Sequence, residues 1–329
     1  MPCRGFCNRR RGDFPATFCA SGERRALPGI ESSANGVYFS KNDGDLGGKR
    51  VLDGDKYILL DSGNFCKLEQ VGRYRLVRPA LNAAWAPELG KAEWDAADAV
   101  FTRNSSGGGK WSFKNPLPPE WTAEYGGLKM LVKPTGFGHL GFFAEQFANW
   151  ERFQNFGGKC REALNLFAYS GLGSLALAKG GARVCHLDAA RGMIEWGKAN
   201  LELNPAIPPK VRWIVDDVTK FVRREARRGA KYDLIALDPP SFGRGSSGQV
   251  WKIEDDLPKL LMLCRELRDP ERPFELVLSC HSPGFSCLVL ERIVAQVFGR
   301  GEFESGEMFI PESTGRKLPA GVSVIFRDE

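Results

Sequence analysis

Residues 163–188, ALNLFAYSGLGSLALAKGGARVCHLD, decide the fold class of this 329-residue chain. An apolar run typical of a strand is followed by a glycine turn, a helical run and a second apolar run. Similar strand runs follow at 211–215, 233–238 and 275–280, with helical stretches between them. Short apolar strands that alternate with helices predict a mostly parallel sheet with both faces covered. The tail after residue 300 is expected to add one or two antiparallel edge strands.

The turn YSGLGSLA (169–176) fits the pattern G-x-G-x-x-G/A. Its glycines allow a tight turn and a close approach of a ligand to the backbone, and the next helix offers its N-terminal N–H groups. An aspartate ends the following strand, where its carboxylate can accept hydrogen bonds from both hydroxyls of a ribose. This pattern fits NAD and S-adenosylmethionine alike, and the alternative is a tight turn without a ligand. The residues expected to bind the cofactor are Tyr169, Ser170, Gly171, Gly173 and Asp188.

Two further acids follow the third strand, in VDDVTKF (215–221). Because the carboxyl ends of parallel strands meet at one edge of a sheet, Asp216 and Asp217 are expected on the same edge as Asp188. We favour Asp217 as a contact of the adenine amino group because it directly precedes a helix. The alternative is a helix N-cap, and one residue can serve both roles.

The fourth strand ends in ALDPPSFGRG (236–245). Asp238 is an acceptor at the ligand-binding edge of the sheet, and it is expected to contact the cofactor as well as the substrate. Pro239 and Pro240 lack N–H groups and have fixed φ, so we expect a loop that is neither helix nor strand and whose carbonyls are free. Phe242 adds a flat face. Together these groups suit a planar substrate with an amino function, such as a nucleobase, although a turn without chemical meaning is the alternative.

These motifs resemble the 23S ribosomal RNA cytosine-C5 methyltransferase family, within the class I S-adenosylmethionine-dependent methyltransferases. The resemblance covers roughly residues 124–282 and includes GLKMLVKPTGFGHLGFFAEQFANW (127–150), DPPSF and LVLSC. It implies a Rossmann-like, seven-stranded, mostly parallel α/β sheet with a smaller β-rich N-terminal region, and S-adenosyl-L-methionine as cofactor. It also implies that Phe143 and Gln146 line the cofactor pocket. In this chain Ser241 follows Asp-Pro-Pro, where the family usually has Lys.

Cys280 ends the fifth strand. A thiolate that adds to carbon 6 of cytosine makes carbon 5 nucleophilic, and Asp238 would assist by hydrogen bonding to the ring nitrogen. The adjacent His281 would then lower the pKa of the thiol, and the alternative is a structural histidine, which is more common at a strand end. The alternative is that Cys280 is a small buried apolar residue. In that case methyl transfer to an exocyclic amine is expected, with Asp238 and the Pro239 carbonyl orienting the nitrogen.

Composition indicates a globular protein without metal or membrane sites. Residues 1–30 contain six Arg and two acidic residues, whereas the remainder holds 40 basic and 38 acidic side chains. This balance is only weak evidence for a nucleic-acid partner, although the basic run 220–231 offers a helical face for phosphates. The alternative is that this face is simply solvated. Nine Cys without a Cys-x-x-Cys pair, together with three His, predict no metal site and a reduced intracellular chain. Apolar runs are too short for a membrane helix.

Three regions are predicted: a leader (1–45), a small β-rich region (46–122) and a methyltransferase domain (123–329). The Arg-rich leader is either a transit peptide for a plastid or mitochondrion, or the unstructured start of a cytoplasmic protein. Residues 56–79 are expected to form two strands, and a Trp-rich irregular stretch follows them. Residues 124–133 are expected to form another strand, and a helix is expected to start near Ala144. The sequence gives no indication of oligomeric state.

The sequence therefore favours a methyltransferase that modifies a base of ribosomal RNA, either at carbon 5 of cytosine or at an exocyclic amine. One alternative is a methyltransferase acting on a protein amide or a small molecule. A second is an NAD(P)-binding oxidoreductase, and a third is a non-catalytic RNA-binding protein that retains the cofactor fold.

Overall fold

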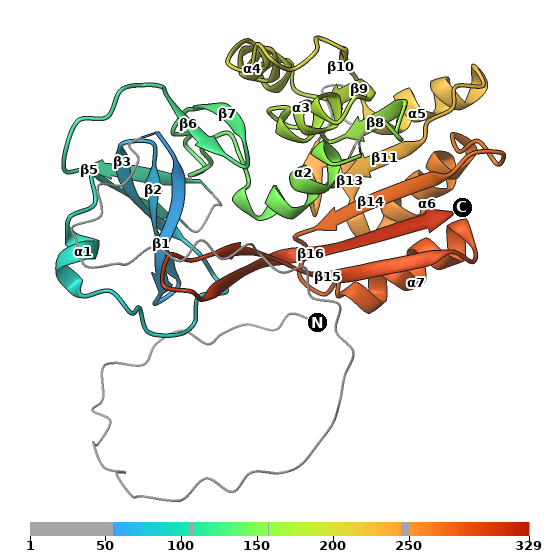
Figure 1. Cartoon of the computed structure of the whole chain (residues 1–329). Helices are drawn as coiled ribbons and strands as arrows, with labels where there is room; N and C mark the ends of the chain where they lie inside the picture. Colours follow the sequence, from blue (N-terminus) through green and yellow to red (C-terminus); the bar gives the residue numbers. More distant parts are fainter. Residues whose placement is uncertain (1–54, 105–107, 157, 245–249, 329) are drawn as a thin grey trace, which may run out of the picture. The chain divides into compact units, whose positions relative to one another are not determined.

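The computed structural model describes residues 55–104, 108–156, 158–244 and 250–328, and its largest sheet has seven strands (Figure 1). Five parallel strands are followed by a pair of strands from the C-terminal tail that run antiparallel to each other. This arrangement confirms the predicted α/β class and the antiparallel tail. The strand order reverses direction at β8, where open sheets of this kind bind ligands. In spatial order the strands are β10 (Val211–Val215), β9 (Arg183–Asp188), β8 (Glu162–Leu166), β11 (Leu234–Leu237), β14 (Phe274–Cys280), β16 (Lys317–Asp328) and β15 (Glu302–Pro311).

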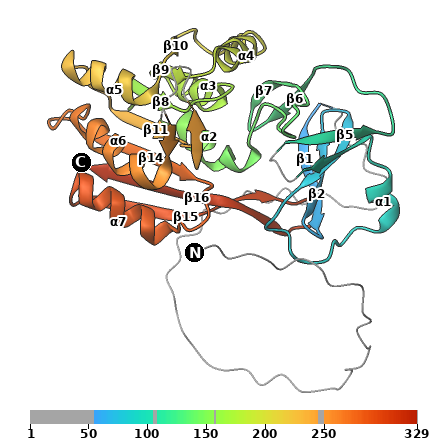
Figure 2. The ribbon, with the colours of Figure 1, turned by 180° about the vertical axis from the view of Figure 1, so that it is seen from behind.

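Two hydrophobic cores lie on opposite faces of this sheet. Successive side chains of a strand point to opposite faces, so Ala163 joins one core while Leu164 and Leu166 join the other. The first core includes residues of α2 (Phe147–Gln154) and α3 (Leu172–Lys179), and α4 (Arg191–Glu202) packs beside α3. The second core includes α5 (Val218–Arg227), α6 (Ile253–Glu266) and α7 (Cys287–Phe298), which are seen from behind in Figure 2. The predicted helices on both faces are therefore confirmed.

A five-stranded sheet precedes the methyltransferase motifs. Its strands, in spatial and chain order, are β1 (Tyr57–Gly63), β2 (Cys66–Val71), β3 (Tyr74–Pro79), β4 (Ala99–Arg103) and β5 (Gly109–Phe113). The prediction of two strands in 56–79 was wrong, because three strands fill this range. The Trp-rich stretch is not irregular, because it contains the helix α1 (Lys91–Asp95) and the strands β4 and β5. The indoles of Trp85 and Trp111 donate hydrogen bonds to backbone carbonyls, which fixes the connections around these short strands.

A glycine pair explains a second difference from the prediction. Gly126 and Gly127 have φ of 62° and 68°, the backbone of a tight hairpin turn. The single strand expected at 124–133 is therefore an antiparallel hairpin of β6 (Trp121–Tyr125) and β7 (Leu128–Val132). The helix expected from about Ala144 begins with a short 3₁₀ turn, η1 (Ala144–Gln146), which leads into α2.

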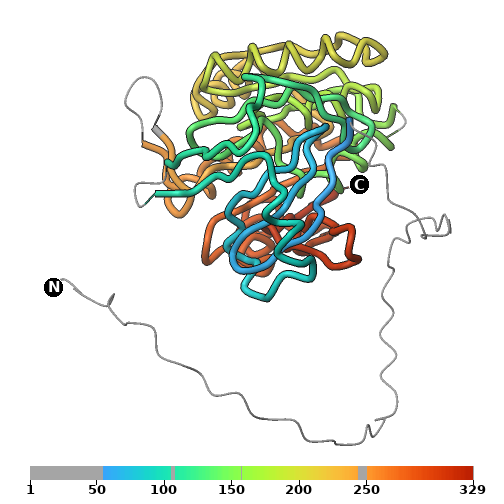
Figure 3. The backbone as a smooth tube through the Cα atoms, turned by 90° about the vertical axis from the view of Figure 1, so that its left-hand side faces the viewer, coloured from blue at the N-terminus to red at the C-terminus, as the bar shows by residue number. Residues whose placement is uncertain are grey.

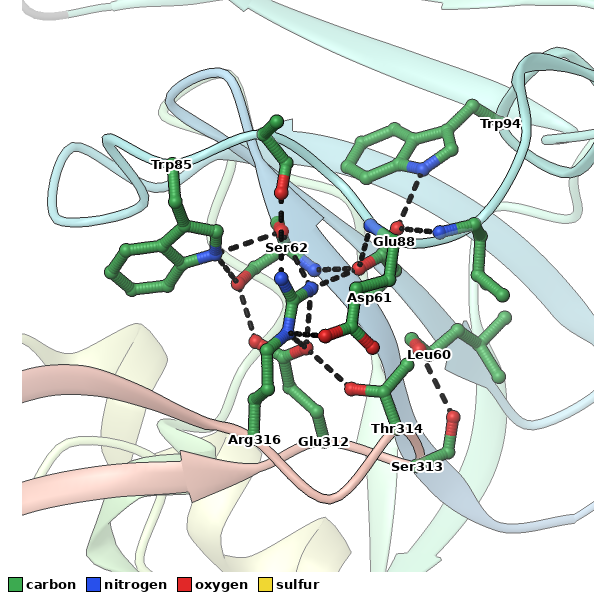
Figure 4. A network of polar contacts seen from close by, with 12 residues as sticks. Leu60, Asp61, Ser62, Trp85, Glu88, Trp94, Glu312, Ser313, Thr314 and Arg316 are labelled. Carbon is green, nitrogen blue, oxygen red and sulfur yellow. Dashed lines mark hydrogen bonds and ion pairs between the residues drawn. The ribbon is translucent and has the colours of Figure 1, made fainter. Parts of the chain in front are cut away.

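The end of the β15–β16 hairpin contacts the first strand of the N-terminal sheet (Figures 1 and 3). Arg316, in the turn of this hairpin, pairs with two fully buried carboxylates, Asp61 of β1 and Glu312, as Figure 4 shows. The hydroxyl of Ser62 also donates a hydrogen bond to Glu312. The last two strands of the large sheet therefore reach the small sheet through a network of buried charges.

Residues Arg50–Glu329 form one compact unit. The predicted leader, 1–45, lies outside the described residues, and the boundary between residues 122 and 123 stays a prediction. None of the helices in the described part of the chain has the length and apolar composition needed to cross a bilayer.

Candidate functional site

A pocket opens at the carboxyl ends of β8, β11 and β14, beside η1 and α2. Polar and aromatic side chains from four separate chain segments line it. The structure brings together six of the predicted site residues in its wall: Phe143, Gln146, Tyr169, Ser170, Gly173 and Asp238. The other predicted residues, which do not line this pocket, are Gly171, Asp188, Asp217, Pro239, Phe242 and Cys280.

The glycine turn has the backbone that the motif predicts. Gly171 is the N-cap of α3 and has φ of 87°, in the left-handed region. A Cβ at Gly173 would lie 3.2 Å from the amide nitrogen of Asn165. Tyr169 is also left-handed, with φ of 51°, an uncommon backbone for a side chain of this size. Tyr169, Ser170 and Gly173 of this turn line the pocket, and the uncommon backbone of Tyr169 favours a ligand role over a simple turn.

Asp188 supports this turn from the end of β9. Its Oδ2 accepts a hydrogen bond from the backbone N–H of Tyr169 (3.0 Å), and its Oδ1 accepts one from Ala190 (2.8 Å). Burial raises the pKa of the Asp188 carboxyl, and these two hydrogen bonds lower it only in part. A carboxylate has about four lone-pair sites, so it can still accept ribose hydroxyls. The ribose contact stays a prediction.

Asp217 is the N-cap of α5. Its Oδ1 accepts a hydrogen bond from the backbone N–H of Lys220 at 2.9 Å. The alternative role considered for this residue is therefore confirmed, while its contact with adenine stays a prediction.

Asp238 has one satisfied and one unsatisfied oxygen. Gln146 donates a hydrogen bond from Nε2 to Oδ2 at 3.0 Å. Oδ1 is buried and lies 3.4 Å from Nε2 of His281, without a hydrogen bond of proper geometry. Buried polar atoms are nearly always hydrogen-bonded, so an acceptor beside a pocket that receives no hydrogen bond from the described residues fits a donor on a bound molecule. Polar side chains of the pocket wall therefore fit a cofactor and substrate with amino and hydroxyl groups.

His281 lies between two carboxylates. Its Nε2 faces Asp238, and its Nδ1 lies 3.9 Å from Oε1 of Glu145. Burial lowers the pKa of His281, but the negative charges of Asp238 and Glu145 outweigh burial and raise it to about 9. The imidazole is therefore protonated at neutral pH, and it neutralises part of the negative charge in this corner.

Sequence reasoning missed three polar residues of the pocket. Asn149 donates to Oε1 of Gln146 at 2.8 Å, and Ser279 lies within 3.3 Å of both. Asn165 donates to the buried hydroxyl of Ser174 at 2.9 Å. The available signal was a polar residue inside an otherwise apolar strand, in ALNL for Asn165 and LVLSC for Ser279.

The loop after Asp238 differs from the prediction. Phe242 begins a short strand, β12 (Phe242–Arg244), which pairs with β13 (Val250–Lys252). The carbonyl of Pro240 accepts a hydrogen bond from the Trp251 indole at 2.7 Å, so it is not free. The prolines restrict their own φ and the residues before them but not the residues after Pro240, and the chain regains N–H donors at Ser241. Pro239 is buried and Phe242 is 53% exposed, and residues 245–249 lie outside the described part.

Cys280 is almost fully buried at the end of β14. Its Sγ accepts a hydrogen bond from the backbone N–H of Ser282 at 3.5 Å. Burial raises the pKa of the Cys280 thiol, and this hydrogen bond lowers it only in part. The expected lowering of the thiol pKa by His281 is therefore wrong, because the imidazole faces the carboxylates. Cys280 belongs to the second hydrophobic core, as its structural alternative predicted.

The basic run of α5 is partly engaged within the protein. Arg224 pairs with Asp216 at 2.8 Å, and Arg228 pairs with Glu225 at 3.1 Å. Lys231 donates to two backbone carbonyls, at 2.9 and 3.0 Å. These contacts reduce the number of cations that remain available for phosphates on this face.

A family model described as S-adenosylmethionine-dependent methyltransferase matches residues 82–279. The chain is similar to ribosomal RNA large subunit methyltransferase I of Cronobacter sakazakii, with 30% identity over 64% of this chain and 55% of the relative. It is also similar to ribosomal RNA large subunit methyltransferase K/L of Syntrophotalea carbinolica, with 38% identity over 32% of this chain and 15% of the relative. The chain therefore spans about half or less of the length of these curated relatives.

A solved structure extends the similarity to most of the chain. The SAM-dependent methyltransferase of Agrobacterium tumefaciens superposes with a TM-score of 0.78 and 37% identity, covering 84% of this chain and 91% of that chain. The family match also selects between the two cofactors that the glycine turn left open, because it favours S-adenosylmethionine over NAD(P).

Proposed function

The chain belongs to the family of S-adenosylmethionine-dependent methyltransferases, and we propose that it methylates an exocyclic amine of a base in ribosomal RNA. The ribosomal RNA methyltransferases among its relatives support the choice of substrate. The observation that carries the proposal is the buried Oδ1 of Asp238 at the edge of the pocket, which faces His281 at 3.4 Å but accepts no hydrogen bond from the described residues. Such an acceptor suits the amino group of a nucleobase.

The pocket residues fit the cofactor by their chemistry. Asp188 offers carboxylate oxygens for ribose hydroxyls, and the turn at Gly171 and Gly173 leaves the backbone open to close approach. Gln146 and Phe143 form the opposite wall. When bound, S-adenosylmethionine supplies an electrophilic methyl group on a sulfonium sulfur.

The residues of the chain position the amine and take up its proton. Asp238 Oδ1 would accept one hydrogen of the substrate amine, and the Pro239 carbonyl would accept the other, so that the nitrogen lone pair faces the methyl donor. Gln146 holds the Asp238 carboxylate through Oδ2 at 3.0 Å, and His281 adds positive charge beside it. Asp238 is then the nearest acceptor for the proton that the nitrogen loses.

Methylation of cytosine at carbon 5 is the second candidate reaction. It needs a thiolate at Cys280, and burial of this residue raises the pKa of its thiol. Because a raised pKa leaves less thiolate at neutral pH, the amine reaction is favoured. Substitution of Cys280 distinguishes the two reactions.

The test is transfer of a labelled methyl group from S-adenosylmethionine to ribosomal RNA, protein and metabolite fractions from cells that lack the protein. We expect label in RNA, and loss of turnover by about a hundredfold or more in Asp238→Asn, which cannot accept the proton. Stabilisation of the variant by S-adenosylhomocysteine should remain, since other residues hold the cofactor. Label in protein or in a small molecule instead of RNA would contradict the proposed substrate.

The compartment depends on residues 1–45. A plastid, a mitochondrion and the cytoplasm each contain ribosomes, so the proposed substrate is compatible with all three. A fluorescent protein fused behind the first 55 residues of this chain tests organellar import directly.

A further inference from the structure

A second cavity adjoins the cofactor pocket and has no role in the proposed reaction. The N-terminal sheet forms one side of it, through β2, β3 and β4, and the segment 137–145 forms the other. Phe142 and Phe143 line both this cavity and the cofactor pocket. A molecule bound here would therefore lie next to the pocket in which Asp238 would hold the reactive amine.

Positive charge dominates the cavity wall. Lys67, Arg78 and Arg103 line it, together with a single carboxylate, Glu145. Behind the wall, the fully buried Glu69 accepts two hydrogen bonds from Arg78, at 2.6 and 2.7 Å, and lies 3.0 Å from the Lys67 ammonium. With Glu145, two buried carboxylates thus face three cations, and Arg103 is the cation left in excess. A buried charge that is incompletely paired is costly, and a bound anion would reduce that cost.

The ionisation of this cluster is consistent with a surplus of positive charge. Burial raises the pKa of Glu69, but Arg78 and Lys67 outweigh burial and lower it to about 2. Burial lowers the pKa of Lys67, with a further contribution from Arg78. Arg103, at the end of β4, is exposed and makes no ion pair with any residue in the described ranges. It also lines the neighbouring cavity, which contains His281.

Aromatic rings lie beside these cations. Phe137 is 63% exposed in the turn at 135–139, and Phe101 and His139 line the same cavity. Arg78 fixes this turn by donating from Nη1 to the Gly138 carbonyl at 2.9 Å. Cations beside accessible aromatic faces are typical of sites for single-stranded nucleic acid, where phosphates meet the cations and bases stack on the rings.

We propose that this cavity binds an unpaired segment of the RNA substrate, with Lys67 and Arg103 on phosphates and Phe137 stacked on a base beside the methylated one. This inference rests on the proposed RNA substrate. Glu145 lines the cavity and lies 3.9 Å from His281, which in turn faces Asp238 at 3.4 Å. These contacts connect the cation-lined cavity with Asp238, which would hold the reactive amine.

The experiment measures binding of the full chain to a fluorescein-labelled single-stranded RNA oligonucleotide, and to the same oligonucleotide annealed to its complement. The test variants are Arg103→Gln and Phe137→Ala. Matched controls are Arg292→Gln on α7 and Phe113→Ala on β5, both exposed and outside these cavities. We expect tighter binding to the single strand. Arg103→Gln should reduce the slope of log affinity against log salt by about 0.7. Phe137→Ala should weaken binding about fivefold or more, as loss of one stacked base predicts.

The same proteins are tested for S-adenosylhomocysteine binding and for methyl transfer to ribosomal RNA. Wild-type affinity and salt dependence in both test variants would overturn the RNA-binding cavity, even if methyl transfer to RNA is observed. Equal losses in the control variants would overturn it as well. If the test variants lose RNA binding while the wild type transfers no methyl group to RNA, the cavity stands and the proposed function fails.

Discussion

The protonation of His281 is set by two carboxylates, and this has a measurable consequence for stability. In the folded protein the pKa of His281 is about 9, above the ordinary value of 6.5, so the folded state binds this proton more tightly than the unfolded chain does. The resulting stabilisation is complete below about pH 6.5 and is lost as pH rises through about 9. The side chain is 35% exposed, so water screens the pairing and the effect should be of the order of 1 kcal/mol.

Urea unfolding of the wild type and His281→Gln at about pH 6 and about pH 9.5 checks this prediction. The wild type should lose more stability than the variant between these values. An equal pH dependence of the two proteins would contradict the pairing of His281 with Asp238 and Glu145. The comparison cancels contributions from other titrating groups, because both proteins contain them.

Cys280 gives a second prediction at the scale of single residues. Because burial raises its pKa and the amine reaction needs no thiolate, Cys280→Ala should keep the turnover of the wild type within about threefold. The variant should unfold somewhat more easily, since the side chain is 1% exposed in the second core. Single-turnover methyl transfer provides the measurement. If turnover falls by several orders of magnitude while S-adenosylhomocysteine binding is intact, the carbon-5 reaction is favoured over the amine reaction.

At the scale of elements, the glycine turn before α3 can be tested with a matched pair of substitutions. Gly171 has φ of 87°, and an added Cβ would lie 3.2 Å from the Cα of Gly197. Gly171→Ala should therefore cost about 1–2 kcal/mol of stability or more and should weaken cofactor binding. Gly192 lies in α4 with open space around it, so Gly192→Ala should stabilise the protein by about 0.5–1 kcal/mol.

Thermal unfolding with and without S-adenosylhomocysteine separates the two effects. The Gly171→Ala protein should show a lower midpoint and a smaller shift with ligand than the wild type. If Gly171→Ala and Gly192→Ala have the same midpoint and the same shift with ligand, stability and cofactor binding do not require the left-handed backbone at Gly171.

The elements that the sequence predicted correctly are those with strong local signals. Continuous apolar runs predicted β8, β9, β11 and β14, and the glycine pattern predicted the turn into α3. The predicted β-rich N-terminal region is confirmed, but some of its strands were not predicted because these short strands carry buried polar residues such as Asp61 and Glu69. The ion-pair partner of Asp61 is Arg316, far away in the chain, and no local pattern indicates this contact.

The same limit applies to the candidate site. Asp238 was predicted because it ends an apolar strand before two prolines. Its contacts with Gln146 and His281 join segments that approach each other only in the folded protein. The cation-lined cavity similarly combines Lys67 and Arg103 with the distant Phe137. Motifs locate such residues at the sheet edge, but packing decides which of them meet.

At the scale of the whole molecule, Arg316 joins the small sheet to the large one. Asp61 and Glu312 have fully buried side chains, and Arg316 is the cation that pairs with both. Asp61 also accepts hydrogen bonds from the backbone of Leu89 and the indole of Trp94, at 2.9 and 3.0 Å. Removing the cation leaves two buried carboxylates without their ion pair, which is strongly destabilising in proteins.

We therefore expect Arg316→Met to lower the free energy of unfolding by about 3–5 kcal/mol. Neutralising the carboxylates as well, with Asp61→Asn and Glu312→Gln, should recover part of this loss because no buried charge then remains unpaired. Arg223→Gln on α5 is the surface control and should change stability by no more than about 0.5 kcal/mol. Urea unfolding followed by tryptophan fluorescence suits this measurement, since Trp85 and Trp94 lie in the network (Figure 4). If the triple variant is less stable than Arg316→Met, hydrogen bonding by the carboxylates, and not their charge, holds the two sheets together.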